Sequence, residues 1–170
     1  MRRKFGLKAL ADRPRSTILL LPETKDAENL GALARSASAF GLDAVLLGPG
    51  SADFLSRRAL RVSMGASLSM PFALVEGAAE LELFRASRWS LVEAVVEPTA
   101  QDVDEWEPEP RTILALGEEY AGLGPAWRDE RDGRVTIRMA RGPDSLNVAA
   151  AGAILMCRLA ARLASGSARD

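Results

Sequence analysis

A short apolar run, a helical segment and a second apolar run follow one another near the start of the chain, and this order restricts the fold more than any other feature. The run at 16–22, STILLLP, ends at a proline and suits a strand that is buried on both faces. The segment 29–41 has Asn29 as a candidate N-cap, Gly41 as a candidate end, and apolar residues at helical spacing: Leu30, Leu33, Ala34 and Ala37. The run at 43–48, DAVLLG, predicts a second strand. This is the order of a βαβ unit, so the two strands are expected to be parallel.

The same alternation continues to the end of the chain. Helices are expected at 52–67, 77–87 and about 145–165, and strands at 70–75, 89–96, 111–117 and 135–139. The segment 97–110 contains three prolines, six acids and no basic residue, so we expect a surface loop with room for a short turn around VDEW. The pattern predicts a single α/β domain over 1–170, with helices on both faces of a parallel sheet and 1–15 as an N-terminal extension.

The absence of histidine narrows the possible chemistry. Ser-His-Asp and Cys-His catalysis are excluded, and so are metal sites built on histidine. Cys157 is the only cysteine, which excludes an internal disulfide, and we expect no metal site. Lys and Arg number 22 against 23 Asp and Glu, and the net charge of -1 argues neither for nor against a nucleic-acid partner.

The chain shows no targeting pattern. The first residues, MRRKFGLKALADRPR, are positively charged but lack the apolar region of a secretory signal. No uninterrupted apolar run approaches the ~20 residues that cross a bilayer. We therefore expect a cytoplasmic protein with no membrane partner.

Three polar or glycine-rich segments directly follow predicted strands. They are PETKDAENLG at 22–31, GEEYAGLG at 117–124 and ARGPDSLN at 140–147. Because ligands of open α/β sheets bind beyond the carboxyl ends of the strands, these segments predict a common binding site. None of them contains G-x-G-x-x-G or a Walker sequence, which disfavours a classical dinucleotide or P-loop site.

Single residues in and near these segments allow two interpretations each. Ser145 and Asn29 suit N-caps as well as site residues. Arg35 suits a solvated helix position, and Glu119 a surface acid. Asn147 is harder to explain, because it lies two residues into the expected helix and the next nine residues are apolar or glycine. A buried amide there needs hydrogen-bond partners, which a ligand at the helix N-terminus would supply.

Four stretches give a more specific indication. Residues 29–41 (NLGALARSASAFG), 114–124 (LALGEEYAGLG) and 137–155 (IRMARGPDSLNVAAAGAIL) resemble the three ordered motifs of the SpoU/TrmH family of RNA ribose 2′-O-methyltransferases, which belongs to the SPOUT superfamily. Residues 58–72 (RALRVSMGASLSMPF) resemble the arginine-containing helix and small-residue turn of that family. The similarity extends roughly from residue 16 to residue 165.

The resemblance implies a parallel-sheet α/β SPOUT fold whose C-terminal part forms a deep trefoil knot, an exception to the usual chain topology. It also implies a homodimer with the terminal helix in the interface, which would account for a helix that is apolar almost all round. The implied cofactor is S-adenosylmethionine (AdoMet), held in a bent shape largely by backbone groups. The residues carried over by position as cofactor-binding are Leu116, Gly117, Ile137, Met139 and Leu146.

The resemblance further implies the active-site residues. Arg35 matches the catalytic arginine, Asn29 and Asn147 match its polar partners, and Glu119 and Ser145 match two further active-site positions. Because a guanidinium stays protonated, we expect Arg35 to hold the target phosphate and to stabilise the developing alkoxide, not to act as a base. The methyl donor is a sulfonium with a good leaving group, so catalysis mainly requires alignment and no metal.

The implied partner is tRNA or rRNA. The candidate RNA-binding residues are Arg35, Arg57, Arg58 and Arg61, although a solvated helix face explains the last three equally well. Two positions depart from the family pattern. The second motif reads Gly117-Glu118-Glu119-Tyr120 where Gly-Asn-Glu-Gly is usual, and Arg138 replaces a usual proline. The altered second motif leaves open a catalytically inactive RNA-binding or assembly protein on the same scaffold. An unrelated α/β nucleotide-binding protein is a third hypothesis, disfavoured by the lack of a phosphate loop.

Overall fold

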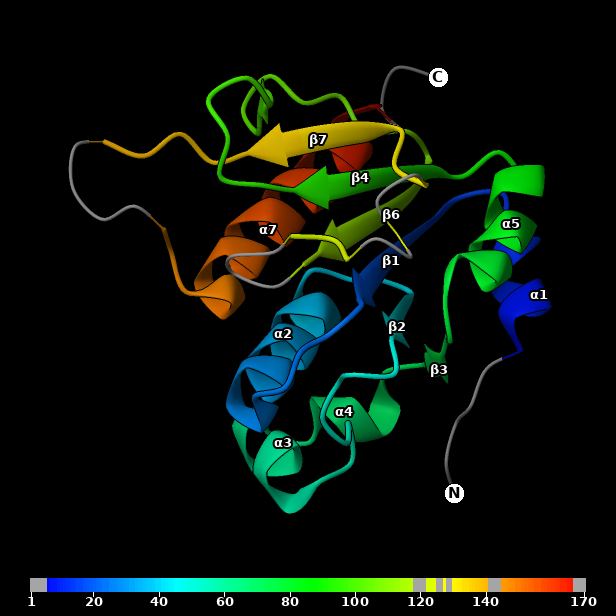
Figure 1. The fold of residues 1–170 in the computed structure, drawn as a ribbon, viewed down its shortest axis with the longest axis vertical. Helices are drawn as coiled ribbons and strands as arrows, with labels where there is room; N and C mark the ends of the chain where they lie inside the picture. Colours follow the sequence, from blue (N-terminus) through cyan, green and yellow to red (C-terminus); the bar gives the residue numbers. More distant parts are fainter. Residues whose placement is uncertain (1–5, 118–121, 125–126, 128–129, 141–144, 167–170) are drawn as a thin grey trace.

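The computed structural model describes residues 6–117, 122–124, 127, 130–140 and 145–166. Its centre is a seven-stranded sheet in the order β3-β2-β1-β6-β4-β7-β5, in which every strand pair is parallel (Figure 1). The strands are β1 (Ser16–Leu21), β2 (Ala44–Leu47), β3 (Phe72–Leu74), β4 (Ser90–Ala94), β5 (Gln101–Asp102), β6 (Arg111–Leu116) and β7 (Gly133–Thr136). The predicted parallel sheet is confirmed.

Helices cover both faces of this sheet, as predicted. They are α1 (Leu7–Ala11), α2 (Ala27–Ala39), α3 (Arg57–Val62), α4 (Ala66–Ser69), α5 (Ala78–Ala86) and α7 (Val148–Gly166). Figure 1 shows the sheet between α2 and α7 on one side and α1 and α5 on the other. Successive side chains of the fully buried strand β1 alternate between the two layers, because neighbouring residues of a strand point to opposite faces. Leu19 and Leu21 pack in the α2–α7 layer, and Ile18 and Leu20 pack in the α1–α5 layer.

The strand order brings together the carboxyl ends of three central strands. Leu116 at the end of β6 pairs with Ala94 of β4, and Ala94 pairs in turn with Val135 of β7. The chain leaves β6 and β7 through the segments that begin at Gly117 and Ile137. The strand predicted at 135–139 lies earlier in the chain, because β7 spans Gly133–Thr136. The residues beyond it are therefore free to face a ligand instead of a neighbouring strand.

The helix expected over 52–67 is two short helices, so that prediction is wrong in detail. Between α3 and α4, Met64 has φ 52° and Gly65 has φ 85°. This left-handed conformation cannot be continued as a right-handed helix. Ser56 caps the start of α3, where its Oγ accepts the Ala59 N–H at 3.3 Å.

The acidic segment 97–110 is more than a surface loop. It contains β5, which extends the sheet beyond β7, and it buries Val103 and Trp106 in the α2–α7 layer of the core. The residues before β1 are also integrated. Leu10 and Ala11 of α1 are fully buried, and the Trp89 indole N–H donates to the Ala11 carbonyl at 3.0 Å.

Candidate active site

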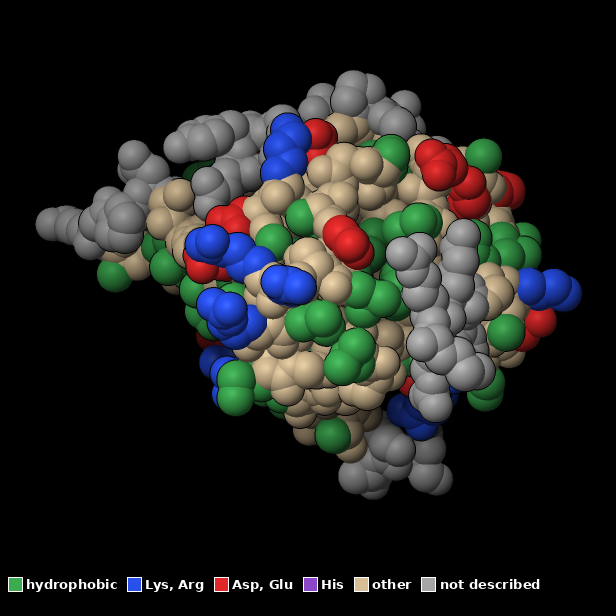
Figure 2. Space-filling model, turned by 90° about the horizontal axis from the view of Figure 1, so that it is seen from below, with side chains coloured by type: hydrophobic (Ala, Val, Ile, Leu, Met, Phe, Trp, Pro, Cys, Tyr) green, Lys and Arg blue, Asp and Glu red, His purple; other side chains and the backbone are tan. Residues whose placement is uncertain are grey.

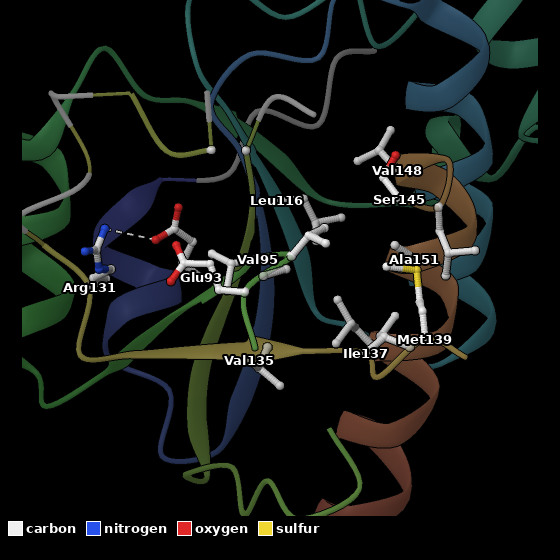
Figure 3. Close-up of a pocket in the computed structure, with 17 residues that line it drawn as sticks. Glu93, Val95, Leu116, Arg131, Val135, Ile137, Met139, Ser145, Val148 and Ala151 are labelled. Carbon is white, nitrogen blue, oxygen red and sulfur yellow. Dashed lines mark hydrogen bonds and ion pairs between the residues drawn. The ribbon is translucent and has the colours of Figure 1, made fainter. Parts of the chain in front are cut away.

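A pocket of about 460 Å³ lies beyond the carboxyl ends of β4, β6 and β7, beside the start of α7. Of the three segments from which the sequence predicted a common site, those after β6 and β7 line this pocket, whereas no residue of 22–31 is among its lining residues. Figure 3 shows side chains from all of these segments turned toward the same space. All the residues expected to bind a cofactor line it, namely Leu116, Gly117, Ile137, Met139 and Leu146. Its size is in the range of ~300–1,000 Å³ that is typical of small-molecule sites.

Gly117 is required by the close approach of two backbone segments. A Cβ atom at this position would lie 2.2 Å from the carbonyl carbon of Gly122 and 2.3 Å from its oxygen. Gly122 itself has φ 61°, a left-handed conformation in which glycine has no steric penalty. The backbone at Gly117 and Gly122 therefore packs without side chains at the edge of the pocket, where a ligand can contact peptide groups directly.

Asn147 is the N-cap of α7, which corrects the expectation that Ser145 has this role. The helix begins at Val148, and Asn147 Oδ1 accepts the N–H groups of Ala149 at 2.9 Å and Ala150 at 3.4 Å. Asn147 is also exposed, not buried as predicted. Ser145 is exposed and lines the pocket just before the helix. Capping accounts for one half of the Asn147 amide, because only Oδ1 is used.

The other half of this amide joins two motifs that are far apart in the sequence. Asn147 Nδ2 donates to Asn29 Oδ1 at 3.1 Å, across a separation of 118 residues. Asn29 is not an N-cap, contrary to the prediction. Helix α2 begins at Ala27, and its cap is Asp26, which accepts the Glu28 N–H at 2.7 Å. Asn29 thus lies in the first turn of α2, where its side chain is available for Asn147.

Arg35 lies farther along α2 and is exposed. It forms no hydrogen bond or ion pair with any residue that the structure describes. Six residues separate it from Asn29, which corresponds to about 9 Å along the helix axis and about 120° around it. The two side chains therefore leave α2 on different faces, and a contact between Arg35 and the Asn29–Asn147 pair is not formed within this chain.

The three arginines of the α3 region are also exposed. Arg58 pairs with Glu28 of α2 at 2.6 Å, whereas Arg57 and Arg61 have no such partner among the described residues. Figure 2 views the molecule from the end where α3 and α4 lie, and it shows Lys and Arg side chains gathered on one side of this face beside hydrophobic ones. Glu119, the remaining predicted catalytic residue, lies outside the described residues.

Sequence reasoning missed the charged residues of the pocket. Glu93 on β4 and Arg131 before β7 line it and pair at 3.0 Å. The available signal was an acid inside the apolar strand sequence SLVEAVV, which a buried strand tolerates only with a partner. Among the described residues, no group of three or more Cys, Asp and Glu is placed to hold a metal ion.

Known proteins resemble this chain over most of its length. The profile of the SpoU rRNA Methylase family matches residues 16–157. An uncharacterized tRNA/rRNA methyltransferase of Mycobacterium tuberculosis is 39% identical over 142 residues, which are 81% of this chain and 49% of the relative. The 23S rRNA (guanosine(2553)-2′-O)-methyltransferase RlmP of Bacillus subtilis is 31% identical over 144 residues, 84% of this chain and 57% of RlmP. This chain therefore spans about half the length of these relatives.

The fold also matches a methyltransferase structure that has been solved. The AdoMet-bound rRNA methyltransferase from Sinorhizobium meliloti superposes with a TM-score of 0.83 at 26% sequence identity, covering 94% of this chain and 61% of the other.

Proposed function

This chain belongs to the SpoU rRNA methylase family, and on that premise we propose that it transfers a methyl group from AdoMet to a ribose 2′-hydroxyl of tRNA or rRNA. The observation that supports this most is the pocket, which is lined by every residue that the family resemblance named for the cofactor. The M. tuberculosis relative is named a tRNA/rRNA methyltransferase and the B. subtilis relative a 23S rRNA methyltransferase. Both names agree with tRNA or rRNA as the proposed substrate. Their names describe enzymes, so they lend no support to a catalytically inactive protein.

The pocket suits a cofactor such as AdoMet. Its walls beside β6 and α7 are apolar, with Leu116, Ile137 and Met139 placed to enclose a flat adenine ring. The half-buried backbone of Gly117 and Gly122 lines the pocket and would offer peptide donors and acceptors to the polar edge of a ring or ribose. When bound, the cofactor supplies an electrophilic methyl group on a sulfonium, whose departure needs no proton.

The protein's own residues would orient the acceptor. Ser145 lines the pocket, and the Asn29–Asn147 pair stands next to it at the start of α7, where the positive end of the helix dipole favours a negatively charged oxygen. The guanidinium of Arg35 would hold a phosphate of the RNA strand and stabilise the alkoxide that forms at the 2′-oxygen. Glu119 is retained as a candidate in the same site. This division of roles requires no histidine and no metal.

We further propose that the protein is a homodimer built on α7. Among the residues of the window Val148–Ser165 only 22% are buried, although its length and composition alone would suffice to cross a membrane. The exposed residues at coiled-coil-like spacing are Ala150, Ile154, Cys157, Ala161 and Ala164. A second copy would cover this stripe through a two-fold axis. Because Arg35 makes no contact with the Asn29–Asn147 pair within one chain, we propose that the Arg35 of the second copy serves the pocket.

Two finer features of the proposal concern topology and location. In sequence order, β6 inserts between β1 and β4, and β7 inserts between β4 and β5. Such late insertion is compatible with a deep trefoil knot formed by the segments after β6 and β7. RNA and AdoMet are both cytoplasmic, and we place the protein there.

The proposal is tested by methyl transfer from radiolabelled AdoMet to total bacterial tRNA and rRNA, together with calorimetric titration of AdoMet. Arg35→Ala is expected to abolish most of the transfer while AdoMet affinity stays unchanged, because Arg35 does not line the pocket. Lys8→Ala is the matched control, since it removes an exposed cation from α1 on the opposite face of the sheet. A protein that neither binds AdoMet nor methylates either RNA would overturn the proposed function, and an Arg35→Ala variant with wild-type activity would overturn the role of Arg35.

A further inference from the structure

Glu93 is a carboxylate in a place where carboxylates are rarely found. It is the fourth residue of the five-residue strand β4 and only 4% exposed, with apolar core residues on neighbouring positions. Asp102 is the only other described carboxylate buried to this degree, and it lies on the edge strand β5. Burying a charge is unfavourable unless partners replace the lost water, so the contacts of Glu93 indicate what it does.

Each oxygen of Glu93 contacts a different segment that borders the pocket. Oε1 accepts a hydrogen bond from the backbone N–H of Leu123 at 2.9 Å, and Oε2 accepts one from Nη1 of Arg131 at 3.0 Å. Leu123 belongs to the segment that follows β6, and Arg131 belongs to the segment that leads into β7. One side chain on β4 therefore contacts both the segment that leaves β6 and the segment that enters β7. Figure 3 shows the Glu93–Arg131 pair at one end of the pocket, with Ser145 and Val148 at the other.

The contact with Leu123 reaches the glycine pair at the edge of the pocket. Gly122 is adjacent to Leu123 in the chain, and a Cβ atom on Gly122 would lie 2.9 Å from Glu93 Oε1. The backbone of Gly122 packs in turn against Gly117, with no room for a side chain between them. The position of Gly117 thus depends on Gly122, and the position of Gly122 depends on the carboxylate beneath it.

We infer that Glu93 is a positioning residue that fixes the backbone cradle at Gly117 and Gly122 for the adenosyl cofactor. This rests on the proposed function, because the cradle is assigned to AdoMet there. Glu93 acts through Leu123 and Arg131 and does not contact the transferred methyl group or the acceptor oxygen. Arg131 balances the charge of the buried carboxylate in an ion pair at 3.0 Å, and a carboxylate oxygen is a stronger acceptor for a backbone N–H than a neutral oxygen is.

The experiment compares three variants by calorimetric titration with AdoMet and with its product S-adenosylhomocysteine. Glu93→Ala removes the hydrogen bond between Oε1 and the Leu123 N–H and is expected to weaken the binding of both by about tenfold. Glu93→Gln retains an oxygen for Leu123 but loses the charge opposite Arg131, and a smaller loss of about threefold is expected. Glu130→Gln is the matched control. It breaks the neighbouring Glu130–Arg85 ion pair, which does not line the pocket, and wild-type binding is expected.

Two further readouts separate positioning from a general loss of structure. In steady-state methylation, Glu93→Ala should raise the KM for AdoMet and leave the KM for RNA unchanged. Hydrogen exchange of the cofactor-free protein should show faster exchange at Leu123 in Glu93→Ala than in Glu130→Gln. Should the alanine variant fail to fold, Glu93→Gln decides the question with the same measurements.

The outcomes are distinct. Wild-type affinity for AdoMet in the folded Glu93 variants would overturn this inference and leave the methyltransferase function standing. Failure of the wild-type protein to bind AdoMet or its product would overturn the proposed function, and with it this inference.

Discussion

Replacing Asn147 separates its two roles, one in starting helix α7 and one in the site. Asn147→Ala removes the cap on the N–H groups of Ala149 and Ala150 and the hydrogen bond to Asn29. Loss of an N-cap costs about 1 kcal/mol. Loss of an exposed neutral hydrogen bond costs about 0.5 kcal/mol, the low end of its range. The expected destabilisation of about 1.5 kcal/mol lowers the Tm of a protein of this size by about 3–6 °C.

Asn147→Asp is the informative partner of this change. Aspartate caps helices as well as asparagine does, and its negative charge is favourable at a helix N-terminus, so the Tm should not fall. The variant lacks the Nδ2 donor, however, and it places a negative charge beside the proposed 2′-oxyanion. If the amide acts on the acceptor, methyl transfer should fall by about a hundredfold, comparable with the loss of one oxyanion donor.

The assays are thermal unfolding followed by circular dichroism and methyl transfer at saturating AdoMet. An unchanged Tm for Asn147→Ala would show that the capping argument is wrong. A fully active Asn147→Asp would show that the amide donor has no part in the reaction, and its meeting with Asn29 would then be structural only.

Three further changes test the pocket, the interface and the acidic segment. Gly117→Ala should abolish AdoMet binding, because its Cβ would meet the Gly122 backbone, whereas Gly124→Ala, with open space around it, should bind normally in the same titration. Ile154→Arg should convert the proposed dimer to monomers in sedimentation equilibrium, and Leu74→Arg, which changes a still more exposed apolar residue on β3, should not. Trp106→Ala should cost about 3–5 kcal/mol of unfolding free energy in a urea titration, since its ring is buried; a change below about 1 kcal/mol would mean that the segment is not anchored in the core.

The sequence predicted those parts of the fold that depend on local periodicity. The run at 16–22 and the helical spacing from Leu30 to Ala37 correspond to β1 and α2, because a buried strand and an amphipathic helix each impose a pattern on contiguous residues. The break at Met64 and Gly65 was not predicted, since one glycine within a helical pattern does not by itself specify a left-handed turn. The observed helix starts differ from the predicted ones by two or three residues. For α2, Asp26 and Asn29 are both good N-cap residues, and only the backbone conformation shows that Asp26 is used.

For the site, the sequence located the segments but not the contacts between them. The residues expected to bind the cofactor line one pocket because they lie at the end of β6 or in the segments after β6 and β7. The strand order places these two strands on either side of β4, so that their ends come together. The Glu93–Arg131 pair spans 38 residues, and nothing in a single sequence relates two such positions. The burial of Trp106 was not predicted either, because its acidic neighbours give the segment the composition of a solvated loop.

The acidic segment also determines where a chain with net charge -1 keeps unpaired positive charge. Its acids face arginines of β7 and α7 and of the residues after β7, in the pairs Glu97–Arg134, Asp102–Arg138, Asp104–Arg158 and Glu107–Arg162. Arg138, which lies between Ile137 and Met139 of the pocket wall, therefore forms an ion pair with the buried Asp102.

This pairing leaves unneutralised arginines at the other end of the molecule. Among the described residues, Arg35, Arg57 and Arg61 at this end are exposed and have no acidic partner, and Arg88 between α5 and β4 is a further arginine of this kind. The first three lie on α2 or α3, which pack against each other, and Asn29 at the start of α2 contacts Asn147 beside the pocket. Local charge, not net charge, governs the approach of a polyanion at distances within about 8 Å, the Debye length at physiological salt. Under the proposed function, we therefore expect an RNA strand to lie along α2 and α3 and to reach the pocket past the Asn29–Asn147 contact.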